Sequence, residues 1–170
     1  MSRWGMLRGS VALALFASPT LLKAAAPLPQ ATAQVLILHP LSVTKLKDMD
    51  FGALVPTLAG TAVLDPNTDT LSTTGGVSAA GGTPHCAEFA GVAGSASVVN
   101  IKVPANPVTL TRVGGTQTMT ASNFTLQGQS KRTLAKAASF TFRVGATLAV
   151  AAGQTEGTYT GTFDVTVQYP

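Results

Sequence analysis

The chain has few of the residues that carry catalysis or bind metals. Its 170 residues include one cysteine, Cys86, and two histidines, His39 and His85, and only 11% of the residues are charged. A single cysteine excludes an intramolecular disulfide, so a packed core must stabilise the fold. We expect Cys86 to be a buried, inert thiol, with pairing between molecules as the alternative. No G-x-S-x-G motif is present. The composition therefore predicts that the protein is not an enzyme.

The residues around the cysteine have only a weak resemblance to a metal site. His85, Cys86 and Glu88 are ligand types, but no second cluster elsewhere in the chain accompanies them. On a strand the adjacent His85 and Cys86 would point to opposite faces, which is poor geometry for a thiol–imidazole pair. His39 precedes Pro40, and we interpret it as a strand-edge residue.

A second group has the opening of a calcium loop. Asp65, Asn67 and Asp69 alternate as in such a loop, but Thr70 stands where glycine is needed and Gly76 where a bidentate glutamate is needed. We therefore expect a turn stabilised by the Asp and Asn side chains. The sequence predicts no metal and no other cofactor.

The N-terminus predicts export. Arg3 and Arg8 come before an apolar run over residues 11–22, and small residues follow at positions 24–26. This is the pattern of a secretory signal peptide, because the run is short for a membrane-spanning anchor. We predict a signal peptide over residues 1–24, and a protein located in the periplasm, at the cell surface or outside the cell.

Signal removal changes the charge of the protein. Arg3, Arg8 and Lys23 leave with the signal, so 8 basic residues remain against 7 acidic ones. This balance excludes a basic surface for nucleic acid. No later apolar run predicts a stable membrane span. We expect a flexible leader over residues 25–33 and a single domain over residues 34–170.

The most regular pattern lies at the end of the chain. Over residues 157–170, apolar and polar side chains alternate, which places the apolar ones on one face of an extended strand. Such a strand has one dry and one wet face, as in an antiparallel sheet that is covered on one side. The residues predicted on the core face of this C-terminal strand are Tyr159, Phe163, Val165, Val167 and Tyr169.

The rest of the chain consists of strand-length runs separated by turn residues. Residues 96–103 and 138–144 alternate clearly, and turn signals recur about every ten residues. One or two helical turns over residues 131–138 are the only helix that the pattern allows. The sequence predicts an all-β, antiparallel sandwich, in preference to a closed barrel.

An apolar extended segment lies just after the leader. Val35, Leu36, Ile37 and Leu38 are consecutive apolar residues, and such a segment must add to the edge of a sheet. If it adds to its own sheet, the protein is a self-complete monomer. If it adds to the next copy, the protein forms a head-to-tail polymer by donor-strand complementation.

Several motifs, in order along the chain, resemble a known exported bacterial family, domain of unknown function 4402. The resemblance covers most of residues 34–170, with a more distant likeness to spore-coat-protein-U type and archaic chaperone–usher pilins. The motifs are Leu41-Ser42-Val43-Thr44-Lys45, Met49-Asp50-Phe51-Gly52, Gly75-Gly76-Val77, Gly157-x-Tyr159-x-Gly161 and Val165-x-Val167-x-Tyr169.

The likeness to pilins implies an incomplete immunoglobulin-like sandwich that accepts an N-terminal strand. It implies residues 32–38 as the donor segment, residues 157–169 as the last strand of the acceptor, and a periplasmic chaperone and outer-membrane usher as partners. Many spore-coat-type pilins have a disulfide, which Cys86 alone cannot form. We therefore expect a non-catalytic, pilin-like subunit of a homopolymer or of a mixed fimbrium, structural or adhesive. The alternative is a monomeric secreted module that binds a glycan or another surface component.

Overall fold

The computed structural model describes residues 32–35, 37, 40–94, 97–134 and 139–170. The chain divides into two units, Met1–Leu36 and Ile37–Pro170, and every described strand belongs to the second unit. The predicted signal peptide over residues 1–24, nearly all of the leader over 25–33, and Leu36, Leu38 and His39 lie outside the described residues. Within the described ranges, no helix has the length and apolar character needed to cross a membrane.

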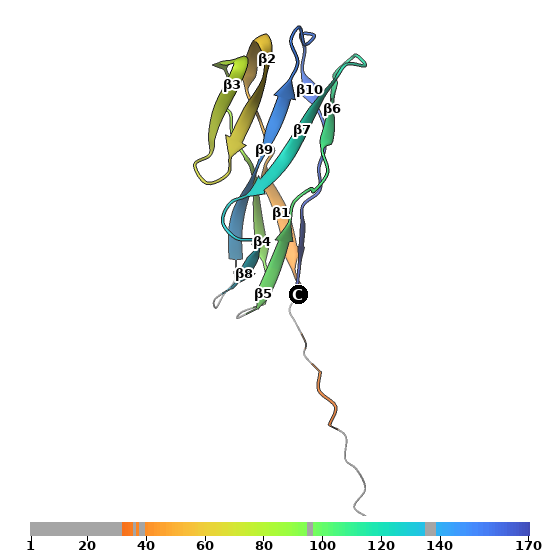
Figure 1. Cartoon of the computed structure of the whole chain (residues 1–170). Coiled ribbons are helices and arrows are strands. Elements are labelled where there is room, and N and C mark those ends of the chain that lie inside the picture. Colours follow the sequence, from red (N-terminus) through yellow and green to blue (C-terminus); the bar gives the residue numbers. More distant parts are fainter. Residues whose placement is uncertain (1–31, 36, 38–39, 95–96, 135–138) are drawn as a thin grey trace, which may run out of the picture. The chain divides into compact units, whose positions relative to one another are not determined.

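The second unit is built from strands (Figure 1). They are β1 (Ser42–Lys47), β2 (Ala53–Asp65), β3 (Thr70–Gly81), β4 (Ala87–Val92), β5 (Val98–Lys102), β6 (Val108–Arg112), β7 (Thr118–Leu126), β8 (Lys131–Thr133), β9 (Ser139–Val150), β10 (Tyr159–Thr160) and β11 (Thr166–Gln168). Every pairing between these strands is antiparallel.

The strands form two sheets. The larger has the order β1-β4-β9-β7-β6-β10, with β2 paired to the end of β9 and β3 paired to β2. The smaller has the order β11-β5-β8. The prediction of an all-β, antiparallel sandwich is therefore confirmed.

Strand β9 is the centre of the larger sheet. It pairs with β4 and β2 along one edge and with β7 along the other, so its backbone is bonded on both sides. Its alternation places Phe140, Phe142 and Val144 in the core, as the sequence predicted. Phe142 is fully buried and stacks on Phe89 of β4, with ring centroids 5.3 Å apart.

The core has two parts, which differ in how they are covered. The first, which we call the two-sheet cluster, has members on both sheets and on the loops between them. They are Ala87, Ala93, Val99, Ile101, Leu134, Phe140, Phe142 and Val144. The second, the one-sheet cluster, lies entirely on the larger sheet. Its members are Ala62, Val77, Ala121, Leu148 and Val150.

The end of the chain differs from the single long strand that the sequence predicted. It forms two short strands in different sheets: β10 pairs with β6 in the larger sheet and β11 with β5 in the smaller. Gly161 lies between them, and a Cβ there would meet the Thr109 carbonyl oxygen at 2.8 Å. Only glycine allows this close approach, at which the chain leaves one sheet for the other. The alternation of half-buried and exposed residues nevertheless continues from position 163 to 170.

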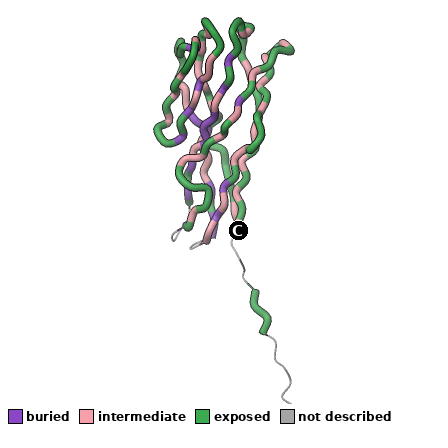
Figure 2. The backbone as a smooth tube through the Cα atoms, viewed as in Figure 1, coloured by how far each residue is buried: buried purple, intermediate pink, exposed green. Residues whose placement is uncertain are grey.

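One further expectation is wrong in part. Residues 131–133, which the sequence allowed as part of a short helix, form strand β8 and pair with β5. Residues 135–138 lie outside the described residues. Figure 2 shows that burial is concentrated in the middle of the domain, while the hairpin of β2 and β3 and the C-terminal segment are mostly exposed or half-buried.

Candidate functional site

A groove of about 860 Å³ opens over the one-sheet cluster. One wall is the chain from Asp48 to Pro56, which connects β1 to β2, and the other is the chain from Gln154 to Phe163. The floor is the inner face of three strands of the larger sheet. Its residues are Leu110 on β6, Met119 and Ala121 on β7, and Leu148 and Val150 on β9.

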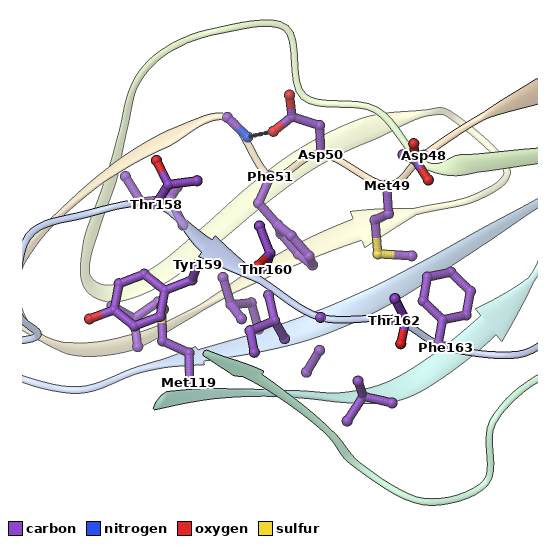
Figure 3. Close-up of a pocket in the computed structure, with 18 of the residues that line it drawn as sticks. Asp48, Met49, Asp50, Phe51, Met119, Thr158, Tyr159, Thr160, Thr162 and Phe163 are labelled. Carbon is purple, nitrogen blue, oxygen red and sulfur yellow. Dashed lines mark hydrogen bonds between the residues drawn. The ribbon is translucent and has the colours of Figure 1, made fainter. Parts of the chain in front are cut away.

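Aromatic side chains from the two walls lie over this floor. Figure 3 shows Phe51 and Tyr159 on the facing walls, with Met119 below Tyr159. Phe163 packs against Phe124 of β7, with ring centroids 5.1 Å apart. The Asp50 carboxylate accepts the Gly52 N–H at 2.7 Å, and this turn positions Phe51. The groove therefore has an apolar interior that extends into the two-sheet cluster through Phe163.

The rim of the groove at the C-terminal wall is polar and carries one charged residue, Glu156. Thr158, Thr160 and Thr162 are exposed and alternate with the half-buried Tyr159. The Tyr159 hydroxyl donates to the Thr155 carbonyl at 2.7 Å and lies 2.7 Å from the Gln154 side-chain nitrogen. These bonds hold the wall in place without closing the groove.

Arg112 attaches the same wall to β6. Its Nε donates to the Glu156 carbonyl at 2.6 Å, and the Val113 N–H donates to the Thr158 carbonyl at 2.8 Å. Since β6 is also paired to β7 along its length, the wall is anchored to the floor at this end.

Strand β1 continues the first wall and is an incompletely covered edge. Val43 opposes Gly91 of β4, which opposes Phe140 of β9, so the three residues lie on the core face of the sheet. The exposed fraction rises along this row, from 8% for Phe140 to 38% for Val43. A core-facing valine with this exposure indicates that the core lacks a covering element beside β1.

Strand β11 shows the same incompleteness in the smaller sheet. Val167 opposes Ile101 of β5, which is almost fully buried, whereas Val167 is only half-buried. Val165 and Tyr169 are half-buried as well, and all three pack against the two-sheet cluster, as do Leu41 and Met49 from the β1 side. Both β1 and β11 are end strands, so one edge of each is free among the described residues.

The predicted donor segment is described only in part. Val35 and Ile37 are each 86% exposed, and residues 32–35 and 37 belong to no strand. Leu36 and Leu38 lie outside the described residues.

The ligand-type residues His85, Cys86 and Glu88 are not grouped as a metal site in the described part of the chain. Cys86 is buried, as predicted, and burial followed by its hydrogen bond to Asp69 raises the pKa of its thiol to about 12. A thiol that stays protonated is a poor nucleophile and a poor ligand. Among the described residues, no group of three or more His, Cys, Asp or Glu side chains is arranged to hold a metal ion.

The region with the calcium-like opening forms the predicted turn. The Asp65 carboxylate accepts the Asn67 N–H at 2.9 Å, which confirms the Asp-stabilised turn between β2 and β3. Asp69 turns away from it and accepts the Cys86 N–H at 2.8 Å. This hydrogen bond, supported by Arg143, lowers the pKa of the Asp69 carboxyl. Asp69 thus ties the hairpin to the start of β4.

Sequence reasoning missed most of the groove. It identified Tyr159 and Phe163 on one wall, but not Phe51 on the other wall or the floor on β6, β7 and β9. The shared parity of Met119 with Ala121, and of Leu148 with Val150, was the signal for an inward face. This parity predicts an inward face, but it does not predict whether a second sheet or another segment covers that face.

A family model described as "Domain of unknown function (DUF4402)" matches residues 41–169. The match begins one residue before β1 and ends one residue after β11, so it includes both walls of the groove. No curated protein and no solved structure matches the chain.

Proposed function

The chain belongs to the family of domain of unknown function DUF4402, and on this premise we propose that it is an exported, non-catalytic, pilin-like surface subunit. In this proposal the subunit has a structural or adhesive role and assembles by N-terminal donor-strand exchange. It would pass through the periplasm, with a chaperone and an outer-membrane usher as partners, and end at the cell surface.

The observation that carries the proposal is the incompletely covered core beside the first strand, β1, and the last strand, β11. In the part of the chain that the structure describes, one edge of β1 and one of β11 are free, and core-facing residues beside them are half-exposed. A single extended strand laid along this line would cover Val43 and Val167 and fill the groove. Burial of such apolar surface is the main driving force for association.

Residues 32–38 have the properties of that strand. Fully extended, they span about 23 Å at about 3.3 Å per residue. They carry four consecutive apolar side chains and no charge. The segment directly precedes β1, which is itself a border of the groove. Insertion of this segment into the groove of a neighbouring copy, repeated from copy to copy, builds an open filament.

The test compares unheated and boiled samples of the exported chain on a denaturing gel. We expect a ladder that collapses to one band on boiling, because donor-strand polymers are kinetically trapped. Ile37→Asp should abolish the ladder, since a charge would enter an apolar groove. Val113→Asp is the matched control, because Val113 is also an exposed apolar residue but lies at the end of β6. A single monomer band in both lanes from the unaltered chain would overturn the proposal.

A second measurement tests the groove directly. A synthetic peptide of residues 32–40 should raise the melting temperature of the folded Ile37→Asp chain, because it binds the native state only. The same peptide with Ile37→Asp should have no effect. Equal shifts with both peptides would contradict a specific donor strand.

The groove volume supports one alternative, a monomeric secreted module that binds a glycan or another surface component. A volume of about 860 Å³ with an apolar floor and a hydroxyl rim is typical of ligand sites. Trp4, the only tryptophan, lies in the predicted signal peptide, so sugar stacking would depend on Tyr159 and Phe51. Saturable glycan binding by the monomer, lost on Tyr159→Ala, would favour this alternative.

A further inference from the structure

Strand β3 is an end strand of a different kind from the others. It has twelve residues, and among the described residues it pairs only with β2, so its outer edge carries unpaired backbone groups. No residue of β3 lines the groove. Whatever covers this edge is therefore separate from the strand proposed for the groove.

Natural sheets protect free edges with charges, proline or short length. The remaining end strands of this domain have such protection. β1 carries Lys45 and Lys47, and β8 is three residues long and carries Lys131 and Arg132. β10 and β11 have two and three residues.

β3 lacks all of these protective features. Its sequence, TLSTTGGVSAAG, contains no charged residue and no proline. From Thr70 to Gly75 its register with β2 is continuous, which leaves a neutral edge of six residues; the register shifts lie beyond Gly75. On β2 beside it, Val55 and Leu58 are 50% and 67% exposed, which adds apolar surface next to the edge.

We propose that β3 is a lateral docking edge that pairs antiparallel with β3 of a second copy of this chain. Two identical neutral edges meet without charge repulsion, and an antiparallel pair around a twofold axis satisfies both edges at once. Among the described end strands, no other is both as long as β3 and free of charge, so the best-matched partner for this edge is β3 of another copy. The contact joins copies side by side, whereas the groove would join them head to tail.

The test measures self-association in the absence of head-to-tail assembly. The full exported chain with Ile37→Asp is studied by sedimentation velocity over a wide concentration range. We expect a monomer–dimer equilibrium. Adding Ser72→Lys and Thr74→Lys, two exposed positions on β3, should weaken the dimer at least tenfold, because like charges would oppose each other across the pair.

The matched control places the same added charge elsewhere. Thr109→Lys and Ala149→Lys lie on exposed positions of β6 and β9, separated by β7, and should leave the dimer unchanged. A monomer at all concentrations in the Ile37→Asp chain would overturn the proposal. A dimer that both lysine pairs weaken equally, or that neither weakens, would do the same.

Cross-linking provides a test that does not depend on the folding of the lysine variants. In an antiparallel pair of identical strands, the numbers of opposing residues add to one constant. Single cysteines at exposed positions within the continuous stretch, such as Thr70, Ser72 and Thr74, should therefore form disulfides only in combinations that share this sum. Cys86 is buried and does not compete. Cross-links in every combination, or in none along β3, would contradict the pairing.

Discussion

The two parts of the core differ in what lies opposite the larger sheet. In the two-sheet cluster, Val99 and Ile101 of the smaller sheet face Phe142 and Val144, and all four are almost completely buried. In the one-sheet cluster, the larger sheet alone supplies the buried residues, and half-buried side chains such as Phe51 and Met119 surround a cavity. The first part is covered by two sheets, except at its borders beside β1 and β11, and the second part has room for another segment.

This difference suggests a division of roles within the domain: the two-sheet cluster stabilises the fold, and the one-sheet cluster provides the surface for binding. Closely packed side chains make many dispersion contacts and exclude water, so the two-sheet cluster should supply most of the folding free energy. The buried residues of the one-sheet cluster are surrounded by half-buried apolar side chains that line the groove. This partly exposed surface costs stability in the free subunit and becomes available for burial on binding. The measurements below use the Ile37→Asp chain, so that assembly does not obscure the free energy of unfolding.

The largest effect is expected in the two-sheet cluster. Phe142→Ala removes a fully buried ring that stacks on Phe89 and Phe140 and lies under the Arg132 guanidinium. We expect a loss of about 3 to 5 kcal/mol in the free energy of unfolding, measured by urea denaturation. A loss below about 1 kcal/mol would show that this cluster is not the stabilising part of the core.

A smaller loss is expected on the floor of the groove. Leu148→Ala should cost about 2 to 3 kcal/mol, at the low end for buried leucines, because Leu148 already borders a cavity and loses fewer contacts. The same urea measurement checks it. If Leu148→Ala costs as much as Phe142→Ala, then the two parts of the core are equally packed and the comparison fails.

The buried thiol of Cys86 should make the free energy of unfolding depend on pH in the alkaline range. Burial raises the pKa of Cys86 to about 12, whereas the thiol in the unfolded chain ionises near pH 9. Its contribution is therefore complete below about pH 9 and falls by about 1.4 kcal/mol per pH unit as the pH rises toward 12.

Cys86→Ala should remove this dependence, so the difference in unfolding free energy between the two chains should change between pH 8 and 10. Parallel pH profiles would mean that Cys86 titrates normally in the folded protein. Slow reaction of the native thiol with a thiol reagent at pH 8, and fast reaction after unfolding, is the independent check.

The smallest effect is expected at the contact that joins the hairpin to β4. The pKa of Asp69 is lowered by the Cys86 N–H and by Arg143, so the stabilisation is present above about pH 4 and is lost as the pH falls through the folded value. Asp69→Asn keeps an acceptor for the N–H but removes the charge. We expect a loss of about 0.5 kcal/mol at pH 7 that diminishes as the pH falls through the lowered pKa of Asp69, measured by thermal unfolding. An undiminished difference at low pH would exclude the charge as its cause.

Local patterns predicted much of this architecture correctly. The alternation of Phe140, Phe142 and Val144, the turn at Asp65 and the burial of Cys86 each depend on a short stretch of chain and on the contrast between apolar and polar side chains. Strand β9 was the clearest case, because both of its edges are bonded and Phe140, Phe142 and Val144 on its inner face are buried.

The sequence by itself determined the class of fold, because the alternation of apolar and polar residues that predicts a strand can be read within one short stretch of chain. Which strands become neighbours depends on contacts between distant residues, and only the tertiary structure decided it. Residues 157–170 have one continuous alternation, yet they divide between two sheets. β10 pairs with β6 in the larger sheet, β11 pairs with β5 in the smaller sheet, and Gly161 allows the chain to cross between them. The groove has the same origin. Leu110, Met119 and Leu148 each belong to an ordinary inward face. Among the described residues no second sheet lies opposite them, so a groove remains above them.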